Sequence, residues 1–288
     1  MKVFLGIILI VVGLLLLVTT ISLPFTSSQK AESGSSLTAD MSNVKTLDLS
    51  STSVDWVIQE HDSQMLKVEL SKQDKQVKLI KKENNETIEI EVKEPRFRFF
   101  SFNFSGKGQA IVYLPVTYKE NVIVNSVSGT IELKNDRNLH SLTSQTVSGN
   151  IVGSNVLVDS FQAKTTSGRI QFKDVASNLT KIESVSGDVQ IDQMSGELDT
   201  KTVSGNVDIG FKEENENTYI KTVSGDVRVN LPVGNADLKL TTVSGDLRID
   251  HTLQQQSVNK RSLTGIIGDG LYPVTIATTS GDIILHER

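Results

Sequence analysis

A short alternation of apolar and polar residues recurs nine times in the second half of the chain, each time just after a glycine. The residue two positions after each of these glycines is a branched aliphatic, and the position four after it is apolar in seven of the nine copies. Only Gly153 and Asp269 break the second position. Such alternation predicts strands with one buried face. The nine glycines are Gly129, Gly149, Gly168, Gly187, Gly205, Gly225, Gly245, Gly265 and Gly281.

These glycines follow one another at intervals of 18 to 20 residues, except for a last interval of 16. A second polar corner near the middle of each interval makes every repeat a strand, a turn, a strand and a turn. A fixed period with the same residue type at the same phase is typical of stacked coils. The predicted fold of residues 126–288 is therefore all-β, a single-stranded parallel β-solenoid of about nine rungs; a sandwich or meander is the alternative.

The corner glycines have a physical reason in such a fold. Glycine supplies a positive φ, or lets two backbones approach closely without a Cβ clash. The Ser, Asp and Asn residues beside it can hydrogen-bond to local backbone groups. The nine glycines are therefore expected to be structural corners.

Residues 44–125 alternate apolar and polar residues in several short runs but lack the repeat. A solenoid's first rung exposes unpaired strand edges and an open core. We expect this region to form a β-rich cap on the first rung.

Before the cap, the stretch from Val3 to Phe25 contains no charged residue and is long enough for a transmembrane helix of roughly 20 residues. A cleaved signal peptide is the alternative, but no small-residue cleavage pattern follows the apolar run. Residues 1–25 are thus predicted to anchor the chain, with Lys2 on the cytoplasmic side and the rest outside. The polar, Ser-rich residues 26–43 are predicted to be a flexible tether.

An aromatic segment, Pro95 to Phe104, holds five of the ten phenylalanines of the chain. Large aromatic rings usually bury, so these rings could plug the end of the solenoid. The alternative is an exposed loop that contacts lipid headgroups or a partner protein. The candidate contact residues are Arg96, Phe97, Arg98, Phe99, Phe100 and Phe102.

Composition excludes several kinds of chemistry. A net charge of −5 with interspersed signs argues against nucleic acid as a partner, and the absence of cysteine removes disulfides and thiolate sites. The four histidines are scattered, without the spacing of a triad or a metal site. We predict no catalytic residue, cofactor or metal ion.

Aspartates follow four of the corner glycines and would form an acidic column. Calcium is one alternative for such a column, and glycan hydrolysis is another. A catalytic pair needs unlike environments, which a repeating corner does not offer, and Arg228 and Arg248 compensate two of the charges. The column comprises Asp188, Asp226, Asp246 and Asp282.

The motifs Thr202-Val-Ser-Gly-Asn206, Thr222-Val-Ser-Gly-Asp226 and Thr242-Val-Ser-Gly-Asp246, preceded by Ile111-Val-Tyr-Leu-Pro115, resemble the bacterial putative-adhesin family, a domain of unknown function. In layout the chain is similar to the LiaG-type membrane-anchored envelope proteins. The resemblance implies an envelope location and a part in adhesion or envelope stress, and it carries over no catalytic residue.

The expected function is that of a non-enzymatic extracytoplasmic protein that binds an envelope protein or a cell-wall polymer. A glycan-acting enzyme and an accessory subunit of an envelope-stress sensor are the alternatives.

Overall fold

The computed structural model describes residues 32–71, 77–94, 108–134 and 139–287. Within these ranges the regular structure consists of 23 β-strands in one mostly parallel sheet, which confirms the all-β prediction. None of the described residues forms a helix long and apolar enough to cross a membrane. The predicted membrane segment, residues 1–25, lies outside the described residues.

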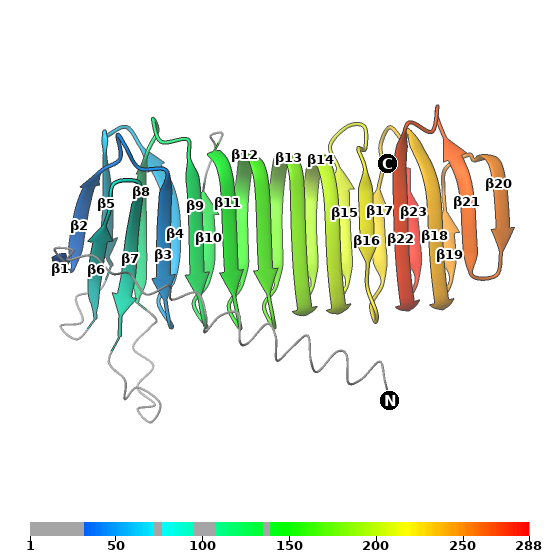
Figure 1. Ribbon diagram of the computed structural model, residues 1–288. Helices are drawn as coiled ribbons and strands as arrows, with labels where there is room; N and C mark the ends of the chain where they lie inside the picture. The colour runs from blue at the N-terminus through cyan, green and yellow to red at the C-terminus, as the bar shows by residue number, and fades with distance from the viewer. Residues whose placement is uncertain (1–31, 72–76, 95–107, 135–138, 288) are drawn as a thin grey trace, which may run out of the picture. The chain divides into compact units, whose positions relative to one another are not determined.

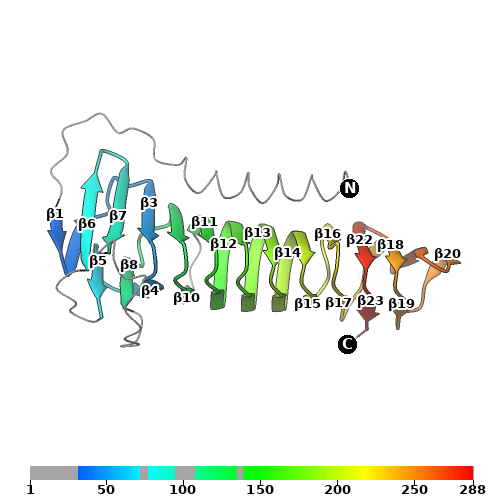
Figure 2. The same ribbon diagram turned by 90° about the horizontal axis from the view of Figure 1, so that it is seen from below.

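Each coil of the stack consists of two strands on either side of a corner, which in the repeat region is the Ser-Gly step. The sheet therefore folds into two faces, which we name face A and face B (Figures 1 and 2). In spatial order, face A contains β1 (Glu32–Gly34), β6 (Lys78–Glu83), β7 (Thr87–Lys93), β3 (Thr46–Ser51), β9 (Asn121–Ser126), β11 (Leu139–Thr146), the second halves of β12 (Ile151–Thr165), β13 (Ile170–Ser186) and β14 (Val189–Ser204), β16 (Thr218–Lys221), β22 (Tyr272–Ser280), β18 (Ala236–Ser244), β21 (Ser262–Ile267) and β20 (Gln254–Asn259). Face B contains β2 (Ser36–Asp40), β5 (Met65–Leu70), β8 (Gln109–Pro115), β4 (Asp55–His61), β10 (Ile131–Lys134), the first halves of β12, β13 and β14, β15 (Val207–Phe211), β17 (Val227–Asn230), β23 (Ile283–His286) and β19 (Leu247–Ile249).

The core lies between the two faces and is built from columns of like residues. The branched aliphatics two positions after the corner glycines stand in register on neighbouring coils, as predicted, and all but Leu247 are buried. Burying each such side chain stabilises the fold by roughly 1.5–3 kcal/mol. The column on face B contains Ile131, Ile151, Ile170, Val189, Val207, Val227, Ile283 and Leu247.

Gly153 lies four positions after a corner glycine, where most coils have an apolar core residue, and packing explains the exception. A Cβ at Gly153 would lie 2.7 Å from the ring of Phe172 on the neighbouring coil. The Phe172 ring fills that space and meets Phe161 edge to face, with 5.1 Å between ring centroids. One large residue therefore compensates for one missing side chain.

At the C-terminal end the coils do not follow the order of the sequence. β22 and β23 lie between β16/β17 and β18/β19, so the last coil of the chain is inserted into the stack. Gly265 is not a corner, and the nine-corner prediction is wrong at this residue. Gly265 lies inside β21, which pairs antiparallel with β18 and forms a terminal hairpin with β20.

The N-terminal region also departs from the prediction of a separate cap. β3/β4 and β7/β8 are two further coils, in parallel register with β9 and β10 and with each other. Only β1, β2, β5 and β6 pair antiparallel and close the end. The tether predicted for residues 26–43 is wrong for residues 32–40, which form β1 and β2 because Leu37 and Ala39 are buried in the core.

Candidate binding surface

The repeated feature with the tightest geometry is the Ser-Gly corner. A Cβ added to Gly168 would overlap the carbonyl oxygen of Gly149, and one added to Gly149 would overlap that of Gly129. The corners therefore stack backbone on backbone, and close approach excludes every side chain. The structure places eight predicted glycines in this arrangement: Gly129, Gly149, Gly168, Gly187, Gly205, Gly225, Gly245 and Gly281.

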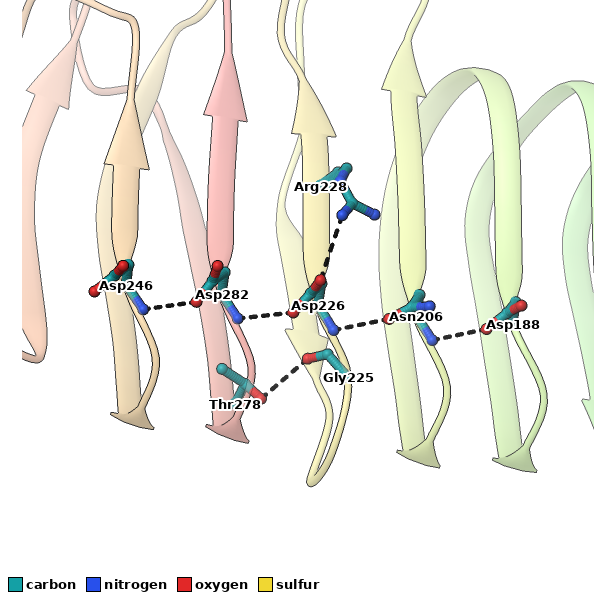
Figure 3. Close-up of polar contacts among 8 residues, drawn as sticks. All are labelled: Asp188, Asn206, Gly225, Asp226, Arg228, Asp246, Thr278 and Asp282. Carbon is teal, nitrogen blue, oxygen red and sulfur yellow. Dashed lines mark hydrogen bonds and ion pairs between the residues drawn. The ribbon is translucent and has the colours of Figure 1, made fainter.

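A buried hydroxyl lies three residues before each glycine, and in six of the eight corners it makes a hydrogen bond at the corner. The hydroxyls of Thr202 and Thr222 have no hydrogen-bond partner among the described residues. Thr146 Oγ1 accepts a hydrogen bond of 3.0 Å from the backbone N–H of Gly149. In the last coil of the chain, Thr278 Oγ1 instead donates to the carbonyl oxygen of Gly225, 3.3 Å away (Figure 3). This role was not predicted from the sequence, although each of the eight corner motifs has a Thr or Ser at that position. The hydroxyl column contains Ser126, Thr146, Thr165, Ser184, Thr202, Thr222, Thr278 and Thr242, all of them buried.

On the other side of the glycine, Asp and Asn side chains link one coil to the next. Asp188 Oδ1 accepts from the backbone N–H of Asn206, and Asn206 Oδ1 accepts from that of Asp226, both at 3.0 Å. Asp226 Oδ1 accepts a hydrogen bond from the backbone N–H of Asp282 at 3.0 Å, and Asp282 Oδ1 accepts one from the backbone N–H of Asp246 at 2.8 Å. Figure 3 shows these bonds as a continuous ladder along the corner. Three of the four aspartates of the acidic column, Asp188, Asp226 and Asp282, thus link neighbouring coils through hydrogen bonds.

Arginines on face B neutralise part of this column, as the sequence analysis expects. Arg228 Nη2 lies 3.3 Å from Asp226 Oδ2, and Arg248 Nη2 lies 3.9 Å from Asp246 Oδ2. Across the four described ranges, no group of three or more His, Asp or Glu side chains is arranged to hold a metal ion.

Outside the core, each corner presents the same residues to solvent. The residue two before the glycine is valine in six of the eight corners; Val127 is 40% exposed and Val243 is 55% exposed. The following serine points outward and is exposed in seven corners. These serines are Ser148, Ser167, Ser186, Ser204, Ser224, Ser244 and Ser280. We name the valine, serine and Asp/Asn positions of the eight corners the corner ribbon.

Each of the four histidines contacts a different partner. His61 contacts the carbonyl oxygen of Met65 at 2.9 Å, and His251 that of Leu231 at 3.0 Å. His140 lies 3.3 Å from the carboxylate of Asp159, and His286 lies 2.7 Å from that of Asp250. The aromatic candidates Arg96, Phe97, Arg98, Phe99, Phe100 and Phe102 lie outside the described residues.

The comparison with known proteins agrees with this architecture. The profile of the Toastrack DUF4097 family matches residues 44–286. The chain belongs to the Toastrack family. This membership confirms the family resemblance drawn from the Thr-Val-Ser-Gly motifs, which in this chain form stacked corners.

Three solved structures match this Toastrack protein over most of its length. A "putative cell adhesion protein" from Clostridium sporogenes is 12% identical, with 91% of this chain and 100% of that chain covered and a TM-score of 0.31. "Putative adhesins" from Bacteroides fragilis and Parabacteroides distasonis are 10% and 12% identical, with TM-scores of 0.48 and 0.47. The matches cover 90% and 89% of this chain and 98% and 97% of those chains. No curated protein matches the chain.

Proposed function

We propose that this Toastrack protein is a non-enzymatic binding scaffold of the bacterial cell envelope, anchored by its N-terminal segment with the β-stack outside the membrane. The observation that supports this most is the corner ribbon, where the same outward residues recur on successive coils about 4.8 Å apart. A surface that repeats in one direction suits an extended or repetitive partner, such as a wall polymer or another envelope protein.

The chemistry of the corner favours binding over catalysis. The carboxylates of Asp226 and Asp282 each accept a backbone N–H from the neighbouring coil in the same geometry. General acid and base groups need environments that push their pKa values apart. Because the same environment repeats along the corner, these carboxylates are not driven to different pKa values. The corner is therefore better suited to a structural and adhesive role than to acid–base catalysis.

Anchoring is supported by the sequence alone. The uncharged stretch from Val3 to Phe25 matches the length of a membrane span, and Lys2 precedes it. We expect full-length protein to remain in the membrane fraction at high salt and to be extracted by detergent. Protease added to intact cells should degrade the β-stack, whereas protection of the stack would contradict the proposed orientation.

The binding role is tested with purified full-length protein in detergent micelles, mixed with isolated cell-wall material and sedimented. Three exposed ribbon serines are changed to glutamate (Ser148→Glu, Ser186→Glu and Ser204→Glu) to obstruct the surface without touching the core. The matched control carries the same added charge at exposed serines away from the ribbon, namely Ser71→Glu, Ser160→Glu and Ser257→Glu.

We expect the ribbon variant to lose co-sedimentation and the control to keep it. Equal behaviour of the two variants would exclude the ribbon as the binding surface. Release of soluble sugar fragments from the wall material would overturn the non-enzymatic assignment.

A further inference from the structure

Lysines from several coils gather on face A beside the corner ribbon. The register places Lys164, Glu183, Lys201 and Lys221 in one outward column, and Lys181, Asp199, Tyr219, Thr275 and Lys239 in the next. We name these two columns the lysine strip. Its five lysines and two carboxylates give a formal charge of +3 on a chain whose net charge is −5. The strip is therefore a local excess of positive charge on an acidic protein.

The two carboxylates of the strip are already engaged. Glu183 lies 2.7 Å from Lys164 and 3.2 Å from Lys181, and these lysines outweigh partial burial and lower the pKa of its carboxyl group. Asp199 lies 2.8 Å from Lys201. Within the described part of the chain, the exposed side chains of Lys221 and Lys239 have no ion-pair partner. The positive charge that remains is available to a ligand.

An aromatic ring lies in the middle of the strip. Tyr219 is 37% exposed and stands between Asp199 and Thr275 of the neighbouring coils. Lys201 Nζ lies 5.3 Å from the centroid of its ring. An exposed aromatic ring offers apolar surface against which the C–H groups of a sugar can pack.

The neighbouring rows of the corner complete an amphipathic surface. Half-buried Val203 and Val223 flank the strip, followed by the exposed hydroxyls of Ser204 and Ser224. From face A toward the corner, the surface therefore offers cations, apolar groups and hydroxyls in parallel rows. The coils from β12 to β18 extend this arrangement over roughly 24 Å at a spacing of about 4.8 Å.

We propose that the lysine strip binds an anionic glycan, a sugar polymer with carboxylate groups that runs across the coils. The carboxylates pair with Lys221 and Lys239, the sugar rings pack on Tyr219 and the valine row, and the sugar hydroxyls bond to the serine row. Charge complementarity selects an anion, and the length of the strip selects a polymer over a small ion. This inference rests on the proposed binding function and specifies its ligand.

The test uses full-length protein in detergent micelles and an oligogalacturonate chain long enough to cover the strip. A neutral maltooligosaccharide of the same length controls for the charge. The variant Lys221→Gln/Lys239→Gln removes the two available cations. Its matched control, Lys173→Gln/Lys260→Gln, removes two exposed lysines elsewhere on the surface. Tyr219→Ser removes the ring, and an unchanged melting temperature verifies the fold of each variant.

We expect Lys221→Gln/Lys239→Gln to raise the Kd for oligogalacturonate roughly ten-fold, while the control pair stays within about two-fold of the unmodified protein. Tyr219→Ser should weaken binding as well, and added salt should weaken it further. The inference is overturned by equal affinities of the two lysine pairs or by equal binding of the neutral sugar. Binding of duplex DNA or anionic vesicles in place of oligogalacturonate would also overturn it.

The two proposals can fail separately. Protein that sediments with wall material but ignores oligogalacturonate refutes the anionic glycan and leaves the scaffold function standing. Protein that binds neither wall material nor envelope proteins refutes the scaffold function itself.

Discussion

Gly168 shows what a single corner requires. Its Cα faces the carbonyl oxygen of Gly149 so closely that a methyl group has no room. We expect Gly168→Ala to lower the free energy of unfolding by about 3 kcal/mol, the upper range for overpacking a buried site. Chemical denaturation measures the loss. Gly108→Ala is the control, because its added Cβ would meet Val54 at an ordinary 3.7 Å; a comparable loss there would contradict the close-approach explanation.

The buried threonines differ in what their hydroxyls do. Thr146 satisfies the N–H of Gly149, whereas the buried hydroxyl of Thr200 has no hydrogen-bond partner among the described residues. Thr146→Val should therefore destabilise the protein by about 1–2 kcal/mol, since it leaves the buried N–H of Gly149 without its acceptor. Thr200→Val should be neutral or stabilising, because it removes an unpaired polar atom. Thermal unfolding of the two isosteric variants tests this difference, and identical shifts would refute it.

The stability of the protein should depend on pH through the side chain of Asp48. Burial raises the pKa of its carboxyl group, the charge of Glu89 raises it further, and a hydrogen bond from Asn125 opposes them. A raised pKa in the folded state means that ionised Asp48 destabilises the protein at neutral pH. Asp48→Asn should therefore raise the free energy of unfolding at pH 7, which chemical denaturation measures.

The pH dependence supplies the control for Asp48. The advantage of Asp48→Asn should be complete above the raised pKa and shrink as the pH falls through it, because protonated Asp48 carries no charge. An advantage that persists unchanged into strongly acidic solution would assign the effect to packing.

At the scale of elements, β23 and β20 should differ in how well their backbone amides are protected from hydrogen exchange. β23 pairs on both sides, with β17 and β19, although it is the last strand of the chain. β20 pairs only with β21, and all six of its residues are exposed. Hydrogen exchange should therefore be much slower in β23 than in β20. Fast exchange throughout β23 would mean that the inserted coil frays like an ordinary terminus.

The strands and their buried faces could be predicted from the sequence because alternation and a constant period record the inward columns directly. Gly265 was misassigned on its Leu-Thr-Gly-Ile context, although the interval of 16 residues after it and the absence of a following Asp or Asn were warnings. The insertion of β22/β23 could not be predicted. Since successive coils carry the same Val and Ile columns, the sequence does not specify which coil is neighbour to which.

The first two coils escaped recognition for the opposite reason. The corner of the β3/β4 coil has Val54 at the position of Gly129 in the next coil, so the Ser-Gly signature of the repeat is absent there. For the surface, the sequence identified the corner glycines and the acidic column. The lysine strip could not be predicted, because it depends on the register between coils and on which side chains face outward.

For the whole β-stack, insertion makes the strands β22 and β23 indispensable. A chain that ends at Leu271 lacks β22 and β23 and leaves both β16/β17 and β18/β19 without their partners. We expect it to lose cooperative unfolding, seen as a broadened transition and protease cleavage after β14. A chain that lacks only Glu287 and Arg288 keeps β23 and should unfold normally. Cooperative unfolding of the longer truncation at an unchanged melting temperature would show that the coils can re-register.

Insertion occurs at both ends, since β7/β8 likewise lies between β3/β4 and the closing strands β5 and β6. During synthesis from the N-terminus, the middle coils can pair in the order in which they are made. The coil β22/β23 pairs later, because it enters a slot between β16/β17 and β18/β19, which precede it in the chain. A chain that stops before β22 therefore keeps unpaired strand edges on both sides of that slot, where another chain could pair.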